Sequence, residues 1–368
     1  MAKTPTLPLF AQTLGASPVL VGVTVMASTI PGILVSLPAG LLSDRIGTKP
    51  LLLAALFVFA TAPFFYLLVH TITQLALIRF YHGFATAIFG TIVGAEIAFR
   101  YPARRGHALG VYSSVSTVGR SLAPFLGGTL ISLAGFPAVF ISCGVAGILA
   151  FMLGIKTADD SPSGPQPLSP AMGRSLRTLF ADRIILTTSL VEALQYFVFG
   201  SVEAFLALYT ARQGWEAWRI GVLLGVQLGV VVLLKPLLGA LSDRRGRRPV
   251  TLAGLVIGAV AVALIPFTHA FWLLFLLNLF FGLGFAGATA ATSALVADRS
   301  RAGHLGASIG LLRSVMDIGQ ASGPVITGAL IEAGGYRIAF TTLGLLLLAA
   351  AILFFLKVPR SEIHASGA

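Results

Sequence analysis

The stretch Gly40-Leu-Leu-Ser-Asp44-Arg45-Ile-Gly47-Thr48-Lys49 decides how this chain of 368 residues is organised, because it occurs twice. Its second copy, Gly239-Ala-Leu-Ser-Asp243-Arg244-Arg-Gly246-Arg-Arg248, lies 199 positions later. The offset of 199 also relates Gly15 to Gly214, Gly22 to Gly221, Pro50 to Pro249 and Gly83 to Gly282, and an offset of 200 relates Gly106, Gly110, Gly119, Pro124 and Gly128 to Gly306, Gly310, Gly319, Pro324 and Gly328. A chance turn has no reason to recur in register with distant glycines and prolines, so the chain is an internal duplication.

The composition places both copies in a membrane. Apolar residues make up 56% of the chain and charged residues only 10%, and the mean hydropathy is +0.92. A soluble domain carries about 25% charged residues, so an ordinary hydrophobic core does not account for this apolar content. The net charge of +12 does not indicate nucleic-acid binding, because the cations stand in short loops between apolar runs and no soluble domain carries them.

Eleven apolar runs are long enough to cross a bilayer, which takes about 20 residues. They are predicted at 19–41, 50–69, 72–98, 108–134, 137–155, 184–211, 218–241, 250–268, 271–297, 305–332 and 336–356. We therefore expect an all-α polytopic membrane protein with an N-terminal bundle (1–155), a Pro- and Ser-rich linker (156–183), a C-terminal bundle (184–356) and a tail (357–368).

The loops orient the chain, because loops rich in Lys and Arg stay in the cytoplasm. One set of alternate loops, with the linker and the tail, holds seventeen Lys and Arg, whereas the opposite set and the amino end hold four, Lys3, Arg212, Arg219 and Arg337. We therefore expect a multi-pass protein of the cell (inner) membrane with its linker and carboxyl terminus in the cytoplasm.

The repeat also predicts a span that the chain largely lacks. The run 184–211 precedes Gly214, whereas only fourteen residues precede its counterpart Gly15. We interpret Leu7 to Gln12 as the outer end of a first span in a parent of twelve spans. A start assigned too late or a truncated chain would explain the missing span, and a natural protein of eleven spans is the alternative.

The two copies of the opening stretch resemble the signature loop of the major facilitator superfamily, which joins the second and third helices of each half. The resemblance implies a fold of two six-helix bundles and a loop that latches one access state, with the residues Gly40, Asp44, Arg45, Gly47, Gly239, Asp243, Arg244 and Gly246. Glycine at 47 permits the tight turn before the next span. Thr48 stands where the family usually has a basic residue, so we expect the first latch to be weaker.

Two further motifs resemble those of the drug:proton antiporters of this superfamily. The first is Leu75-x-x-x-Arg79-x-x-x-Gly83, with Asn278 at the position equivalent to Arg79. The second comprises Gly110, Gly119, Pro124, Gly127 and Gly128, with Ala123 in place of one glycine, and recurs as Gly310, Gly319, Pro324 and Gly328. The resemblance implies export, although helix packing alone also selects small residues at such spacings.

Ionisable residues inside a bilayer are candidates for function because their burial is costly. Glu192 and Glu203 lie eleven residues, about three turns, apart on one predicted helix and so share a face. The proton-coupling or substrate-cavity candidates are Arg79, Arg120, Glu192, Glu203, Arg313 and Asp317. Arg313 and Asp317 are four residues apart and can pair with each other. A purely structural role is the alternative for Arg79. Lys235 lies one turn from a cytoplasmic loop, and we expect its side chain to extend toward that loop.

Other classes of function find little support in the residues. The chain has no Gly-Lys dipeptide and hence no phosphate-binding loop of the kind that a primary pump needs, and its six histidines show no metal spacing. We predict a monomeric secondary transporter rather than an enzyme, without cofactor or metal, that uses a proton as coupling ion and exports a small drug-like compound or metabolite by alternating access at the interface of its halves. Proton-coupled uptake, sugar or organic-acid exchange, and a non-transporting membrane receptor or enzyme are the alternatives.

Overall fold

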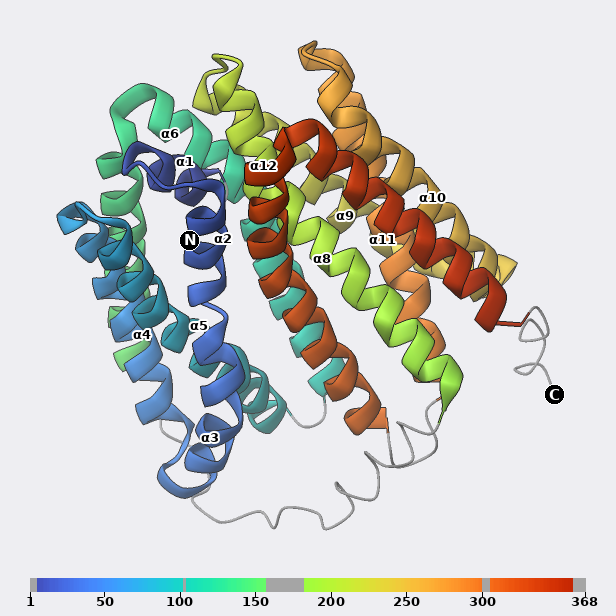
Figure 1. Ribbon diagram of the computed structural model, residues 1–368. Helices are drawn as coiled ribbons and strands as arrows, with labels where there is room; N and C mark the ends of the chain where they lie inside the picture. The colour runs from blue at the N-terminus through green and yellow to red at the C-terminus, as the bar shows by residue number, and fades with distance from the viewer. Residues whose placement is uncertain (1–4, 102–103, 157–181, 300–304, 360–368) are drawn as a thin grey trace. The chain divides into compact units, whose positions relative to one another are not determined.

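The computed structural model describes residues 5–101, 104–156, 182–299 and 305–359, and within these ranges it is almost entirely helical (Figure 1). The linker, most of the tail and the side chains of Gly40, Asp44, Arg45 and Arg313 lie outside the described part. Clustering of contacts divides the chain into two units, one of residues 1–168 and 216–221 and one of residues 169–215 and 222–368.

The first unit is formed by the helices α1 to α6. Their bounds are α1 Thr6–Thr13, α2 Pro18–Ala27, α3 Ile30–Ile46, α4 Thr48–Phe65 with the 3₁₀ turn η1 Tyr66–Leu68, α5 Ile72–Arg100 and α6 Arg105–Ile155. Helix α5 packs against α2, α3 and α4, and α6 packs against α4 and α1.

The second unit contains the remaining helices. Their bounds are α8 Arg183–Arg212, α9 Ala217–Arg245, which begins in the short segment assigned to the first unit, α10 Arg247–Leu264 with the 3₁₀ turn η3 Ile265–Phe267, α11 Phe271–Arg299 and α12 Leu305–Lys357. Helix α12 packs along α8 and α10, and α11 packs against α10 and α8.

Equivalent helices of the two copies begin and end at equivalent residues, which confirms the duplication in three dimensions. Helices α4 and α5 and the turn η1 coincide at both ends with α10, α11 and η3 at the offset of 199. The short helix α1 ends at Thr13, 199 positions before the end of α8 at Arg212. Helix α1 therefore corresponds to the outer end of α8, as predicted.

Single glycines join several consecutive spans. Gly47 alone separates α3 from α4, and Gly246 alone separates α9 from α10, with φ angles of 85° and 94°. The long helices α6 and α12 each contain two predicted spans, which meet at Gly135 and Gly335 with φ angles of 74° and 77°. Such φ angles are unfavourable for residues with a Cβ, so each joint requires glycine.

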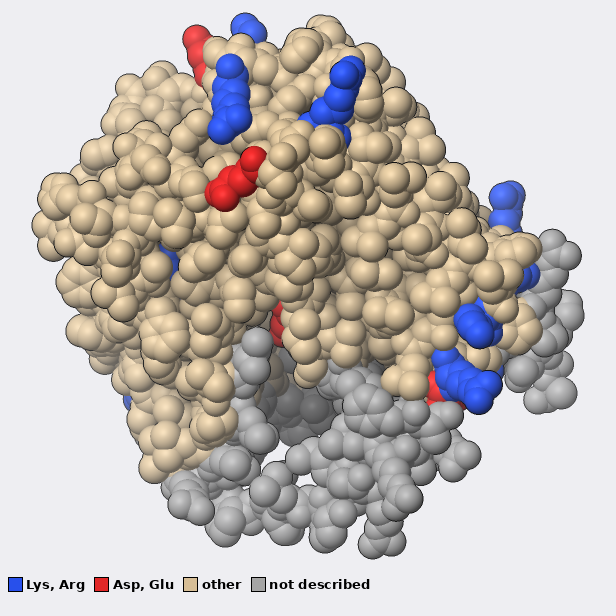
Figure 2. Space-filling model, in the orientation of Figure 1, with Lys and Arg blue, Asp and Glu red and all other residues tan. Residues whose placement is uncertain are grey.

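Eight of the described helices are long and apolar enough to cross a membrane. Two of them, α6 and α12, contain apolar stretches of 46 and 44 residues, and each is long enough for two crossings. Figure 2 shows a face of the molecule that is mostly uncharged, with few Lys, Arg, Asp or Glu side chains on it. The span predicted at 19–41 is not one continuous helix, because the structure divides it into α2 and α3. Pro31 explains the division, since its nitrogen carries no hydrogen and cannot donate to the carbonyl of Ala27.

The glycines of α12 bring that helix unusually close to α8. A Cβ built on Gly319 would lie 2.2 Å from the carbonyl oxygen of Ala193, and one on Gly323 would lie 2.2 Å from that of Phe197. In the first unit the equivalent Gly119 has open space around such a Cβ. Close packing against α8 therefore explains Gly319, whereas the given sequence has no counterpart of this part of α8 to pack against Gly119.

We expect Gly319→Ala to lower the free energy of unfolding by about 1–3 kcal/mol, because the added methyl group must separate α12 from α8. Gly119→Ala is the matched control and should leave stability unchanged. Thermal unfolding of the purified protein in detergent measures both. An equal loss in the two variants would contradict the assignment of close packing to Gly319 and not to Gly119.

Candidate functional site

Glu192 on α8 is fully buried and is held by hydroxyl groups of α11. The hydroxyl of Thr292 donates to one carboxylate oxygen, and that of Ser293 donates to the other at 3.4 Å. Lys235 on α9, which is half-buried, lies near enough for its charge to interact with the Glu192 carboxylate. Glu192 therefore connects three helices of the second unit through polar contacts in an apolar interior.

More buried polar groups surround Glu192 on its own helix. Thr188, Ser189 and Gln195 lie within about one turn of it and are at most 4% exposed. Their hydroxyl groups and the amide nitrogen of Gln195 have no hydrogen-bond partner among the described residues. Because buried polar groups are costly without partners, such a concentration is typical of a site that takes up water, a proton or a ligand.

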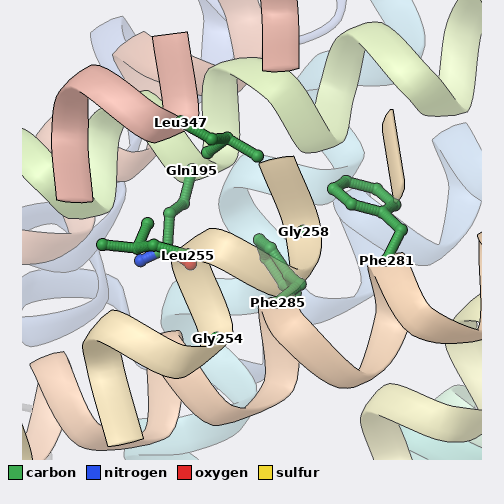
Figure 3. Close-up of a pocket in the computed structure, with 7 residues that line it drawn as sticks. All are labelled: Gln195, Gly254, Leu255, Gly258, Phe281, Phe285 and Leu347. Carbon is green, nitrogen blue, oxygen red and sulfur yellow. The ribbon is translucent and has the colours of Figure 1, made fainter. Parts of the chain in front are cut away.

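A small cavity opens beside Gln195 (Figure 3). Its volume is about 10 Å³, which is enough for one water molecule. Its lining residues come from α8, α10, α11 and α12 and comprise Gln195, Gly254, Leu255, Gly258, Phe281, Phe285 and Leu347. Drug-sized ligands occupy pockets of about 300–1,000 Å³, so this cavity does not by itself hold a substrate.

Aromatic rings form one wall near the same carboxylate. Phe199 of α8 stacks on Phe285 of α11 with ring centroids 4.3 Å apart, and Tyr196 meets Phe285 edge-on at 5.1 Å. Tyr196 lies one turn after Glu192 on α8 and is only partly buried. The second unit thus places a carboxylate, an amide and a phenol beside a face of aromatic rings.

The other predicted charged residues lie in different surroundings. Glu203 is half-buried on α8, Arg120 is exposed on α6, and Asp317 is exposed on α12. Within the described residues, Glu192 is the predicted carboxylate that the fold buries completely. The sequence had given Lys235 no part in the site, and Thr292 and Ser293 were missed because hydroxyl groups on an apolar helix give little signal.

Arg79 on α5 is 2% exposed and belongs to the first unit, whereas Glu192 belongs to the second. Its Nε donates to the carbonyl oxygen of Thr24 at 3.4 Å, and its Nη2 donates to the hydroxyl of Ser28. The Tyr66 side chain also interacts with this guanidinium group. The contacts described for Arg79 thus lie within the packed interior of one bundle.

The second copy of the signature loop is an ion-pair network. Arg247 pairs with Asp243 and, with 3.0 Å between Nε and Oδ2, with Asp298 at the end of α11. Its Nη1 also donates to the hydroxyl of Ser242 at 2.7 Å. The ends of α9 and α11 are therefore tied together through the first residue of α10.

The first copy of the loop differs at the residue equivalent to Arg247. There the hydroxyl of Thr48 donates to Glu96 of α5, and Glu96 also pairs with Arg100, as expected from their spacing of four residues. A neutral hydroxyl that donates to one carboxylate therefore stands where the second copy has a cation that pairs with two carboxylates.

The helix motifs lie where the duplication predicts them, in α6 and in the first part of α12. Pro124, Gly127 and Gly128 are buried, as are Gly319, Pro324 and Gly328. Gly110, like Gly119, has open space around a built Cβ, and Gly310 lies in the first turns of α12.

Comparison with known proteins fits this fold. The chain matches the family model of the Major Facilitator Superfamily over residues 3–234 and 219–368 and belongs to that superfamily, which is a family of membrane transporters. No group of three or more His, Cys, Asp or Glu side chains in the described residues could hold a metal ion.

Individual relatives are distant but nearly full-length. The chain is 23% identical to the uncharacterised MFS-type transporter MJ1560 of Methanocaldococcus jannaschii, over 97% of the chain and 93% of the relative. It is 25% identical to the multidrug resistance protein MdtG of Enterobacter lignolyticus, over 97% of the chain and 88% of the relative. A crystal structure of a mutant of the nucleoside transporter NupG shares its fold, with a TM-score of 0.83 at 15% identity, over 97% of this chain and 96% of that one.

We expect Thr292→Val to destabilise the protein by about 1–3 kcal/mol, because it removes a hydroxyl donor from a buried carboxylate while preserving side-chain volume. Thermal unfolding in detergent gives the size of the loss. The double variant Thr292→Val with Glu192→Gln should lose less than the sum of the two single variants, since the two residues contact each other. Additive losses would show that this hydrogen bond does not contribute.

Proposed function

We propose that this member of the Major Facilitator Superfamily is a proton-coupled secondary transporter that exports a small drug-like compound or metabolite, and that Glu192 carries the coupling proton. The observation that supports this most is the complete burial of Glu192 among Thr292, Ser293 and Lys235. The two hydroxyl groups can hydrogen-bond to the carboxyl group in either form, whereas Lys235 interacts favourably with its charged form.

The chemistry of the three partners explains how this would work. As a carboxylate, Glu192 accepts from both hydroxyl groups of α11 and compensates the charge of Lys235. After protonation it can turn from acceptor to donor toward a hydroxyl oxygen, and the charge of Lys235 loses its compensation. Proton uptake thereby changes the contacts among α8, α9 and α11, and a ligand that brings or removes charge does the same. Alternating access needs such a differential interaction with two states.

Export is favoured over uptake by resemblance. MdtG is named for multidrug resistance and matches nearly the whole chain, and the glycine and proline motif of α6 resembles that of drug:proton antiporters. Tyr196, which is partly buried, lies at the edge of the buried and stacked Phe199 and Phe285. The alternative is uptake, which the fold shared with a nucleoside transporter keeps open. Glu203, Arg120, Arg313 and Asp317 remain secondary candidates for the substrate path.

Inverted membrane vesicles acidified by respiration test the coupling. We expect addition of a transported compound, from a panel of drugs, dyes, nucleosides and organic acids, to release protons from the lumen and raise its pH. Glu192→Gln should abolish the release, because glutamine cannot exchange a proton.

Glu216→Gln is the matched control, since Glu216 is an exposed carboxylate in the loop before α9, and it should retain the response. Loss of the response in both variants, or in neither, would contradict the assignment of the proton to Glu192. Compound accumulation without a pH change would favour a uniporter.

We also propose that the chain is a monomer in the cell (inner) membrane and that its carboxyl terminus is cytoplasmic. The orientation is inferred from the excess of Lys and Arg in one set of loops. A reporter that is active only in the cytoplasm should be active when fused after residue 368 and inactive when fused into the loop at Gly214. The reverse result would invert the topology.

A further inference from the structure

The break between α2 and α3 lies deep inside the first unit, and the second copy has no such break. Helix α2 ends at Ala27 and α3 begins at Ile30, whereas α9, which is equivalent to both, runs from Ala217 to Arg245 without interruption. Pro31 causes the difference, because the equivalent residue is Val230. A helix broken by proline within a membrane needs new partners for its freed backbone groups, because lipid offers none.

Side chains donate to carbonyl groups in the turn just before the break, at Thr24 and Val25. At the break the Thr29 amide turns back to the Met26 carbonyl, and the Ser28 hydroxyl donates to the Val25 carbonyl at 3.2 Å. Arg79 of α5 then donates to that same hydroxyl and, through Nε, to the Thr24 carbonyl at 3.4 Å. One guanidinium group thus reaches the last turn of α2 and the serine that caps the broken turn.

Gly83, one turn after Arg79, makes room for the break. A Cβ on Gly83 would lie 2.6 Å from the Ser28 carbonyl oxygen and 2.8 Å from the Pro31 ring. The spacing of Arg79 and Gly83 is therefore explained by one task, which is to receive the broken segment of the neighbouring helix. Leu75, at the other end of the motif, is fully buried in the same unit.

In the second copy the equivalent contact between helices is made by a shorter side chain. Asn278, equivalent to Arg79, donates its amide to the Leu223 carbonyl, and Leu223 is equivalent to Thr24. Gly282 lies against Gln227 as Gly83 lies against Ser28, since a Cβ there would be 2.8 Å from the Gln227 carbonyl oxygen. A short amide is sufficient where the helix is continuous, and the longer, five-donor arginine stands where it is broken.

We propose that Arg79 is a positioning residue that fixes the joint between α2 and α3, and that transport by this chain depends on Arg79 through the geometry of that joint. Its cation is held by backbone and hydroxyl oxygens of one bundle, which accounts for its burial. The transport part of this inference rests on the proposed function, whereas the joint itself does not.

The chain's own second copy supplies the variants for the test. Arg79→Asn introduces the residue of position 278, and Pro31→Val introduces that of position 230 and restores a backbone donor for the Ala27 carbonyl. We expect Arg79→Asn alone to loosen the joint, and Arg79→Asn with Pro31→Val to tighten it again, because a continuous helix satisfies its own carbonyl groups.

Spin labels at Leu20 on α2 and Leu42 on α3, in a Cys143→Ser background, report on the joint without any substrate. Both side chains are about two-fifths exposed, and 22 residues of helix place them about 33 Å apart, within range of pulsed dipolar measurements. The expected result is a narrow distance distribution in the parent, a broad one in Arg79→Asn and a narrow one in the double variant. Ser28→Ala, which changes no charge, should also broaden it.

An unchanged distribution in both Arg79→Asn and Ser28→Ala would overturn the assignment of Arg79 to the joint. In vesicles we expect Arg79→Asn to lower the maximal transport rate at least tenfold and the double variant to regain most of it. Rescue of the distance distribution without rescue of transport would overturn the positioning role and favour direct contact of Arg79 with proton or substrate. If the parent transports none of the panel, the proposed function fails, and the distance measurements still decide the role of Arg79 in the joint.

Discussion

Backbone polar groups inside a bilayer must find their partners within the protein, and most of this structure follows from that constraint. It makes the described residues almost entirely helical and restricts the joints between α3 and α4 and between α9 and α10 to a single glycine each. It also makes any break inside a span expensive. The break after Ala27 persists because Ser28 and Arg79 provide donors for the turn that Pro31 disrupts.

The duplication shows how one scaffold acquired two different halves. The helices coincide in register, yet Arg79 faces a broken helix and Asn278 an unbroken one, and Thr48 stands where Arg247 joins Asp243 to Asp298. In a strictly symmetric protein the two halves would respond alike to any bound ligand. At equivalent positions the second bundle thus has an arginine paired with two aspartates and the first has a threonine that donates to one glutamate.

Burying the polar groups around Glu192 costs free energy, and the needs of ordinary packing do not explain why they are there. A leucine at this position would fill the same space between α8 and α11 without requiring Thr292, Ser293 or Lys235. The neighbouring Thr188, Ser189 and Gln195 add buried polar atoms that lack partners among the described residues. Buried ionisable groups inside a membrane protein are candidates for function, and this chain belongs to a family of transporters.

The sequence by itself determined the class of fold, the duplication and the turn glycines, because hydropathy, charge in loops and register are local properties. It identified Gly47 and Gly246 from their place between apolar runs, and it identified Glu192 because a carboxylate is conspicuous there. It could not determine that Glu192 rather than Glu203 is enclosed, that hydroxyl groups of α11 reach it, or that Arg79 contacts Thr24 and Ser28. These depend on how helices rotate and approach one another, and such packing results from contacts between residues that lie fifty to a hundred positions apart.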